Sequence, residues 1–344
     1  MSALLLMCMR LVAAFHFNSN GQFKIVQFTD LHFNNDNRSN DATIRVMYRI
    51  LDAETPDFVV LSGDVITGDD EITTDTEWFP RLWKMAVSPM VNRSTPYSII
   101  LGNHDGHAHM SRTDIVQLDM QQPMSATKII PGIAASNYFI DVVNATTGYR
   151  MWFFDSMDSE CRGRHSWGCV DDAVVDWATQ IPNKLPGIAF IHIPIYQMDD
   201  AKLSQKLGIK QEFISKPRFD TGIMHFTSSQ NVGAMFFGHD HGNDFSGKLA
   251  GVTLAYGRNT GYGGYDVNHM MKGARVIQLE LGAEMQTWIR LENGTKYFQT
   301  EFRSYIPSLT TMVLFVVFVV CCLIGFIFIM YKDTMHIMYQ VVNN

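Results

Sequence analysis

Two histidines, His239 and His241, follow a short apolar segment at residues 234–237 and are separated by a single aspartate. The apolar residues predict a buried strand that ends at Gly238. The histidines could belong to a polar turn, or they could be ligands of a metal ion, because imidazole is a common ligand of transition metals. A metal site requires further ligands elsewhere in the chain.

Four other apolar segments, which we also predict to be strands, end in side chains that can bind a metal. These side chains are Asp30 and His32, then Asp64, then Asn103, His104 and Asp105, and finally His192. In open α/β sheets, ligands bind beyond the carboxyl ends of the strands. Side chains from five separate strand ends can therefore meet at one point, which ordinary turn chemistry does not explain.

The residue types in this set restrict the metal. Carboxylates, imidazoles and one amide are present without a cysteine, which excludes thiolate zinc and iron–sulfur sites and suits iron, manganese or zinc. The seven candidate ligands are Asp30, His32, Asp64, Asn103, His192, His239 and His241. Seven ligands are too many for one such ion, but they suffice for two ions that share a carboxylate. Two metal ions roughly 3.5–4 Å apart can hold a phosphoryl group during its transfer.

The segments between these strand ends predict the elements that position them. Residues 41–56 and 75–87 have helical spacing and alternate with the first three strands, so the chain opens β-α-β-α-β, which implies parallel strands. A further helix is predicted at 171–181, and antiparallel strands are predicted after His241. No linker rich in Pro, Gly or Ser divides the chain, so we expect one domain over residues 21–303.

The order of the motifs D-x-H, G-D, G-N-H-D, a single H and G-H-x-H resembles that of the calcineurin-like metallophosphoesterases, over Phe23 to Leu291. The stretches GHDHGNDFSG and LAYGRNTGYGGY are similar to the purple-acid-phosphatase relatives that lack an N-terminal β domain. The resemblance implies an α/β fold, a β-sandwich of two mixed sheets flanked by helices. It implies a phosphomonoesterase that acts on a phosphate ester. A phosphodiesterase of the same fold and a catalytically inactive, receptor-like ectodomain are the alternatives.

The resemblance also implies a role for each matching residue. One metal ion would be held by Asp30, His32 and His241, and the other by Asn103, His192 and His239, with Asp64 bridging the two. His104 would face the leaving group without binding a metal. Asp105 could hold the imidazole of His104 or be a simple turn residue. Arg258 could contact the phosphate or be an ordinary surface arginine.

One position departs from the purple acid phosphatases. They have a tyrosine three residues after the bridging aspartate, where this chain has Thr67. We therefore expect no tyrosinate-to-metal charge-transfer colour. The Asp-Arg pair that follows this aspartate in protein Ser/Thr phosphatases is also missing, so neither group supplies the metal identities or the substrate.

The two ends of the chain predict a membrane protein. Residues 1–14 resemble a signal peptide, although Arg10 interrupts the apolar run and a buried first strand is the alternative. Residues 309–331 are predicted to be a transmembrane helix, because about 20 apolar residues span a bilayer. The segment 332–344 would be a cytoplasmic tail. This topology is that of a single-pass type I protein of an endomembrane, lysosome-like compartment or of the cell surface.

Other features bear on the compartment and the partners. In an oxidising compartment Cys161 and Cys169 would pair, and free thiols are the alternative. Glycosylation sequons occur at Asn37, Asn92, Asn144 and Asn293. The segment YQVV at Tyr339 fits a pattern that endocytic adaptors bind, or it could lie along the bilayer surface. The net charge of −7 argues against a nucleic-acid partner.

Overall fold

The computed structural model describes residues 14–68, 75–307 and 309–342. The chain separates into two compact units, Met1–Arg303 and Ser304–Asn344, which we describe one after the other. The predicted signal peptide at residues 1–14 lies outside the described residues, apart from Ala14.

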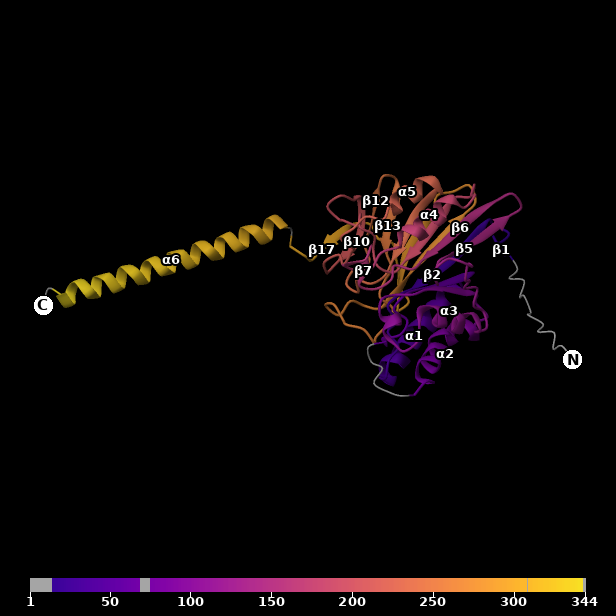
Figure 1. Cartoon of the computed structure of the whole chain (residues 1–344), viewed down its shortest axis with the longest axis horizontal. Helices are drawn as coiled ribbons and strands as arrows, with labels where there is room; N and C mark the ends of the chain where they lie inside the picture. Colours follow the sequence, from indigo (N-terminus) through magenta and orange to yellow (C-terminus); the bar gives the residue numbers. More distant parts are fainter. Residues whose placement is uncertain (1–13, 69–74, 308, 343–344) are drawn as a thin grey trace. The chain divides into compact units, whose positions relative to one another are not determined.

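The first unit is built on two large sheets (Figure 1). The six-stranded sheet runs in the order β16 (Lys296–Tyr297), β15 (Gln286–Leu291), β14 (Gly273–Glu280), β2 (Gln22–Phe28), β3 (Phe58–Ser62) and β4 (Tyr97–Ile100). The nine-stranded sheet runs in the order β1 (Phe15–His16), β5 (Tyr138–Asn144), β6 (Thr147–Phe154), β9 (Gly187–Ile191), β11 (Val232–Phe237), β13 (Val252–Tyr256), β12 (Ser246–Leu249), β10 (Ser204–Lys210) and β17 (Phe302–Ser304). A small hairpin pairs β7 (Glu160–Cys161) with β8 (Arg164–His165).

The pairing follows the predicted order of elements. Strands β2, β3 and β4 are parallel neighbours, as the β-α-β-α-β pattern requires. In the other sheet β6, β9 and β11 are parallel neighbours. The expectation of antiparallel strands after His241 holds for β14 and β15 but is only partly right for β13. This strand is antiparallel to β12 and parallel to β11, because a two-residue turn returns the chain to the edge of β11.

An apolar layer between the two sheets holds them face to face. It joins Ile25 and Phe58 of the six-stranded sheet to Phe153, Phe190 and Phe236 of the nine-stranded sheet. The Phe190 ring stacks on those of Phe153 and Phe236, with centroids 5.5 Å apart in each pair. Burying such large apolar side chains is the main source of stability in this layer.

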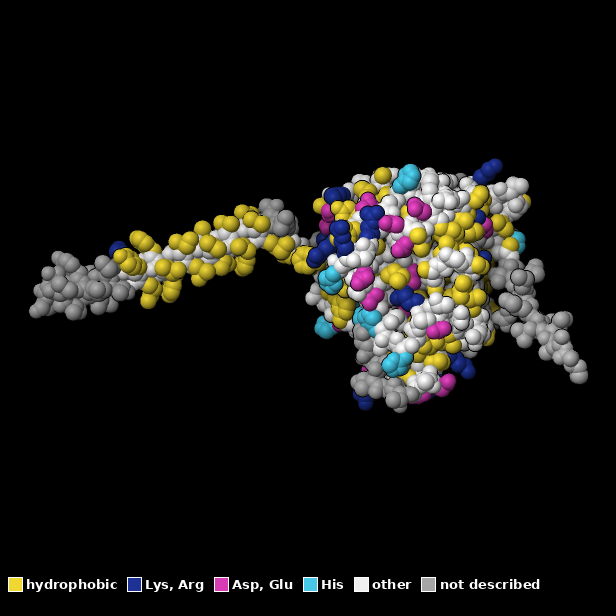
Figure 2. All heavy atoms as spheres, viewed as in Figure 1, with side chains coloured by type: hydrophobic (Ala, Val, Ile, Leu, Met, Phe, Trp, Pro, Cys, Tyr) yellow, Lys and Arg dark blue, Asp and Glu magenta, His cyan; other side chains and the backbone are white. Residues whose placement is uncertain are grey.

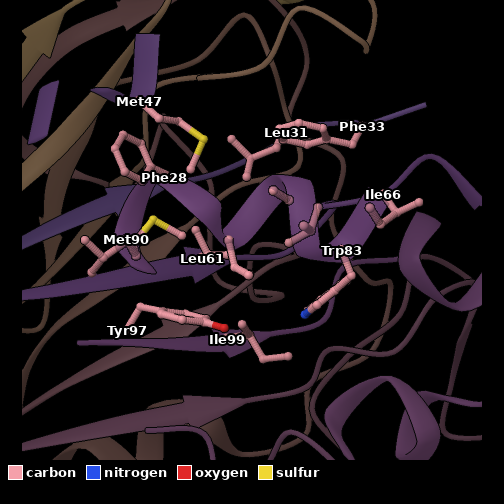
Figure 3. Close-up of a cluster of buried hydrophobic side chains, with 14 of the residues drawn as sticks. Phe28, Leu31, Phe33, Met47, Leu61, Ile66, Trp83, Met90, Tyr97 and Ile99 are labelled. Carbon is pink, nitrogen blue, oxygen red and sulfur yellow. The ribbon is translucent and has the colours of Figure 1, made fainter. Parts of the chain in front are cut away.

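Helices cover the outer face of each sheet. On the six-stranded sheet lie α1 (Asn37–Glu54), α2 (Trp78–Asn92) and α3 (Arg112–Met120), whose apolar faces meet strand residues in the cluster of Figure 3. On the nine-stranded sheet lie α4 (Asp172–Gln180) and α5 (Ile223–Ser229). The helix α1 begins four residues before the predicted segment, because the side chain of Asp36 caps it by accepting from the Arg38 N–H. The predicted sandwich of two mixed sheets flanked by helices is thus confirmed.

The second unit is the helix α6 (Leu309–Val342). Its segment Thr311–Lys332 has a mean hydropathy of 3.3, is not buried, and is long and apolar enough to cross a membrane. Figure 2 shows hydrophobic side chains along it. Free cysteines at positions 321 and 322 lie in this segment. The predicted tail, 332–344, continues the helix as far as Val342, and the side chain of Tyr339 lies outside the described residues.

Candidate metal centre

The candidate ligands follow the carboxyl ends of five strands. Asp30 and His32 follow β2, Asp64 follows β3, Asn103 follows β4, His192 follows β9, and His239 and His241 follow β11. All seven are buried. A buried polar set of this size is costly unless its members bind one another or a metal ion.

The backbone at these strand ends is shaped to bring the side chains together. Asp30, His32, Asp64 and His239 have φ between 50° and 75°, in the left-handed region that non-glycine residues rarely adopt. Such strain costs about 1–2 kcal/mol per residue and concentrates at functional sites. The glycines of the G-D and G-N-H-D motifs are required for the same purpose, because a side chain at either position would collide with a ligand. A Cβ on Gly63 would lie 2.4 Å from His192 Nδ1, and one on Gly102 would lie 2.1 Å from Asp64 Oδ1.

The first group of ligand atoms belongs to Asp30, His32 and His241, whose ligand atoms all lie within 4.8 Å of one another. The two imidazoles face each other with 3.2 Å between their Nε2 atoms. His241 Nε2 lies 3.6 Å from Asp30 Oδ1. Asp30 also accepts from the backbone N–H of His239, which ties the ends of β2 and β11 together.

The second group consists of Asp64, His192 and His239, again with ligand atoms within 4.8 Å. His192 Nε2 lies 3.0 Å from Asp64 Oδ2, and His32 Nε2 of the first group lies 3.7 Å from the same oxygen. Asp64 therefore lies between the two groups. Asn103 adjoins them, because the next residue, His104, donates its backbone N–H to Asp64 Oδ1 at 2.8 Å.

With Asn103, which the resemblance assigns to it, the second group contains three buried atoms that fit a metal ion. Among the residues that the structure describes, Asn103 Oδ1, His192 Nε2 and His239 Nε2 have no hydrogen-bond partner. His192 Nε2 is close to Asp64, but the contact lacks hydrogen-bond geometry. Buried polar atoms are nearly always bonded in folded proteins. The two imidazole nitrogens of His192 and His239, whose ligand atoms lie within 4.8 Å of one another, and the amide oxygen of Asn103 are suitable types of ligand for a transition metal.

The other ring nitrogen of three histidines is fixed by a partner. His192 Nδ1 lies 2.8 Å from the carbonyl of Ser62, and His241 Nδ1 lies 2.9 Å from that of Tyr265. A carbonyl can only accept, so Nδ1 donates its proton to the carbonyl and Nε2 is the nitrogen that is left to face a metal ion. His32 Nδ1 lies 3.0 Å from the hydroxyl of Thr67, which occupies the position of the missing tyrosine.

The charges in the site attract a cation. Burial acts to lower the pKa of His192, but the carboxylates of Asp64 and Asp30 outweigh it and raise the pKa to about 9. Burial acts to raise the pKa of Asp64, but His192 and His32 hold it well below its usual range. The pKa of His239 falls to about 3, first through burial and then through His192. A carboxylate that stays ionised between imidazoles suits a positive ion at Nε2.

The predicted catalytic residues lie beside the ligands. The half-buried ring of His104 lies edge-to-face with that of His32, at 5.1 Å between centroids. The carboxylate of Asp105 accepts from the backbone N–H groups of Ile66 and Gly102. Those bonds tie the loops after β3 and β4 together, so Asp105 organises the backbone of the site. Burial and the nearby Asp64 raise its pKa to about 6.

Arg258 is buried, so the alternative of an ordinary surface arginine is wrong, and its contact with phosphate stays a prediction. Its side chain is buried, and its guanidinium donates to Asp244 at 2.6 Å and to the carbonyl of Met271 at 2.8 Å. These are the contacts of a structural ion pair. The arginine that does support the site is Arg112, which the sequence did not single out. It donates to the carbonyl of Gly102 and to Asp155 at the end of β6, so it joins loops from the two sheets.

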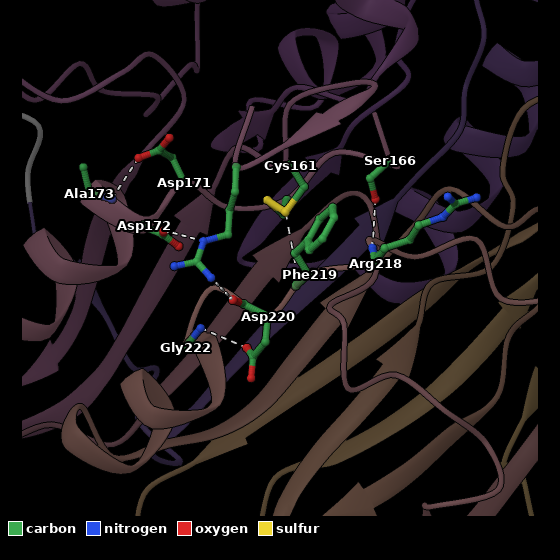
Figure 4. The surroundings of a disulfide bond; sticks show 11 residues. Cys161, Ser166, Asp171, Asp172, Ala173, Arg218, Phe219, Asp220 and Gly222 are labelled. Atoms are coloured by element: carbon green, nitrogen blue, oxygen red, sulfur yellow. Dashed lines mark hydrogen bonds and ion pairs between the residues drawn. A yellow bond between two sulfur atoms is a disulfide. The ribbon is translucent and has the colours of Figure 1, made fainter. Parts of the chain in front are cut away.

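Two aromatic residues near the ligands were also missed. The ring of Trp167 lies 4.5 Å from that of His239, and the ring of Tyr265 stacks on His241 at 3.9 Å. No local motif marks Trp167, whereas Tyr265 is the last residue of the stretch LAYGRNTGYGGY and was given no role there. The predicted disulfide between Cys161 and Cys169 is present (Figure 4). The sequon residues Asn37, Asn92, Asn144 and Asn293 are all exposed, and their glycosylation stays a prediction.

Comparison with known proteins gives one family match, two relatives and one structural neighbour. The family model of the calcineurin-like phosphoesterases matches residues 23–243. Probable inactive purple acid phosphatase 28 of Arabidopsis thaliana is 29% identical over 339 residues, covering 85% of this chain and 84% of its own length. Probable inactive purple acid phosphatase 29 of the same plant is 27% identical, covering 80% and 84%. A dimetal phosphatase from Danio rerio shares the fold with a TM-score of 0.52 at 12% identity, covering 77% of this chain and 98% of its own.

Proposed function

The chain belongs to the calcineurin-like phosphoesterase family, and on this premise we propose that it is a metal-dependent phosphomonoesterase anchored in a membrane. The observation that supports the proposal best is the pair of buried ligand groups on either side of Asp64, with three ligand atoms that lack a hydrogen-bond partner in the described part of the chain. A structural site for one ion would not need two such groups.

The residues of the site would have two kinds of role, metal binding and proton transfer. Asp30, His32 and His241 would hold one ion, and Asn103, His192 and His239 the other, with Asp64 between them. Bound metal ions would lower the pKa of a water and offset charge on the phosphoryl oxygens. His104 is held beside the ligands by its own backbone bond to Asp64, and its imidazole can protonate the leaving oxygen.

A phosphodiesterase is the second candidate within the family, because a metal pair serves both reactions. The purified full chain in detergent should therefore be assayed with p-nitrophenyl phosphate and with bis-p-nitrophenyl phosphate, with and without added Mn²⁺, Zn²⁺ and Fe²⁺. Faster metal-dependent hydrolysis of the monoester supports the proposal. Faster hydrolysis of the diester would replace it with the phosphodiesterase.

An inactive ectodomain is the third candidate, and the names of the two Arabidopsis relatives, which describe those proteins as inactive, favour a loss of activity. Against it, this chain fills every ligand position of the predicted set, and six of the seven fall into two buried groups in the described part of the structure. Elemental analysis of the purified chain separates the two readings. About two metal ions per chain together with hydrolysis would support an enzyme, whereas metal-free protein without activity after reconstitution would support a binding role.

We further propose a type I topology, with residues 21–303 on the lumenal or extracellular side, 309–331 in the membrane and 332–344 in the cytoplasm. The apolar segment Thr311–Lys332 and the Cys161–Cys169 disulfide support it, since disulfides persist in oxidising compartments. Resistance to alkaline extraction, protease protection of the domain in intact vesicles and a mass shift after deglycosylation would test it. Exposure of the domain to protease in intact vesicles would contradict it.

A sorting role for the tail rests on sequence alone. The pattern YQVV at Tyr339 fits the short peptides that endocytic adaptors bind. The variant Tyr339→Ala should move the protein toward the cell surface and leave the hydrolysis rate unchanged. An unchanged distribution in microscopy would remove this proposal.

A further inference from the structure

Trp167 lies next to the metal centre in an unusual way. It belongs to the loop that the Cys161–Cys169 disulfide closes, and its ring is edge-to-face with that of His239, with centroids 4.5 Å apart and planes at 77°. The side chain is 42% exposed, although it contacts a buried ligand. A large aromatic side chain has much apolar area to offer a ligand, and part of that of Trp167 stays at the surface beside the centre.

The loop holds Trp167 in a fixed position. The residues on each side, Ser166 and Gly168, are buried and donate their backbone N–H groups to the carbonyls of Ser159 and Asp158. The hydroxyl of Ser166 also accepts from the backbone of Arg218 (Figure 4). A Cβ on Gly168 would lie only 2.2 Å from the carbonyl of Ser156, so only glycine fits beside the tryptophan.

The other ligand group has a similar neighbour. The ring of Tyr265 stacks on His241 at 3.9 Å with nearly parallel planes, and its side chain is 52% exposed. Each of the two groups therefore has a half-exposed aromatic ring resting on one of its imidazoles. Half-exposed aromatic rings beside a charged centre suit a ligand that combines an anionic group with a flat apolar part.

We propose that Trp167 determines substrate specificity by packing its exposed indole against the leaving group of the phosphate ester. This inference rests on the proposed function and adds a substrate class. The preferred substrates are phosphate monoesters of aromatic or other flat apolar alcohols, rather than of small alkyl alcohols or polyols. Aromatic pairs contribute about 0.5–1.5 kcal/mol beyond the area they bury, which corresponds to a preference of roughly 2- to 12-fold from this contact.

The first test compares kcat/KM for phenyl phosphate and ethyl phosphate in the full chain. Trp167→Ala should lower the phenyl-to-ethyl ratio by about fivefold, and Trp167→Phe should restore most of it. The matched control is Phe298→Ala, which removes a 50% exposed aromatic that packs on Trp288 of the six-stranded sheet. Its ratio should equal that of the wild type. An equal loss for both substrates in Trp167→Ala would overturn the proposal.

Two further measurements, metal content and phosphonate binding, distinguish a role of Trp167 in specificity from a purely structural role. They also test that role independently of the proposed activity. Metal content should be the same in the wild type and in Trp167→Ala, since a loss of metal would show that the indole only supports His239. Calorimetry should show that phenylphosphonate binds more tightly than methylphosphonate, and that Trp167→Ala removes the difference. Equal binding of the two phosphonates, or binding of neither, would overturn the inference. If neither ester is hydrolysed, the proposed activity fails, and the phosphonate comparison still decides the role of Trp167.

Discussion

The two sheets contribute different chemistry to the same site. The loops after β2, β3 and β4 of the six-stranded sheet supply both carboxylates and the amide, together with His32. The loops after β9 and β11 of the nine-stranded sheet supply imidazoles alone, at His192, His239 and His241. The negative charge that draws a cation into the site thus comes from one sheet, and the other completes the ligand sets with imidazole nitrogens.

This division means that the two sheets should respond differently to substitution. A change on the six-stranded side alters the charge that both ions share. A change on the nine-stranded side removes one donor from one ion. Four variants, two with a matched control variant, test the comparison, and they are given in order of decreasing expected effect.

The variant Asp64→Asn should cause the largest loss, because Asp64 lies between the two ligand groups and neutralising it removes charge from both. We expect kcat/KM to fall on the order of 10⁴-fold, with fewer than one metal ion per chain by elemental analysis. The control is Asp52→Asn, which changes an exposed carboxylate paired with Arg93 on the surface and should leave both quantities unchanged. Full metal content in Asp64→Asn would contradict the bridging role.

The variant His239→Ala should remove one ion and leave the other. Its Nε2 is one of three atoms in the second group without a hydrogen-bond partner in the described chain, whereas Asp30, His32 and His241 stay intact. We expect about one metal ion per chain and a loss of activity on the order of 10³-fold. The exposed His225 provides the control through His225→Ala. Loss of both ions would show that the two groups are not separable.

The variant His104→Ala should leave the metals in place and slow the reaction by roughly 10²- to 10³-fold. The backbone N–H of residue 104 still reaches Asp64 after the substitution, so the ligand arrangement persists. The effect should fall on kcat rather than on metal content. Emptying of the site in this variant would show that His104 is a ligand.

The variant Thr67→Val should have the smallest effect. It removes the hydroxyl that lies 3.0 Å from His32 Nδ1 while keeping the shape of the side chain. Loss of such a partner weakens metal affinity by about 10- to 100-fold, so activity should fall at limiting metal and recover with excess metal. Thr67→Ser should behave as the wild type. Because no tyrosine occupies this position, the wild type should lack a visible charge-transfer band, and a violet preparation would contradict that expectation.

The sequence by itself determined the features that depend on neighbouring residues. Apolar runs followed by a polar residue revealed the strand ends, and in three of the five a glycine precedes the polar residue, since turn chemistry is local. The polar residues at the strand ends were the candidate ligands. The long apolar segment near residue 320 identified the one described helix that is able to cross a membrane. The family resemblance then supplied the two-sheet fold.

Only the tertiary structure decided which distant residues meet. Thr67 lies 35 residues from His32 and Asp30 lies 209 residues from His239, and no local pattern encodes either contact. The same holds for Trp167 against His239, for the buried pairing of Arg258 with Asp244, and for Asp105, whose carboxylate binds backbone rather than merely forming a turn. Strand ends are set by short-range preferences, whereas the packing of two sheets and their loops determines what each side chain at those ends contacts.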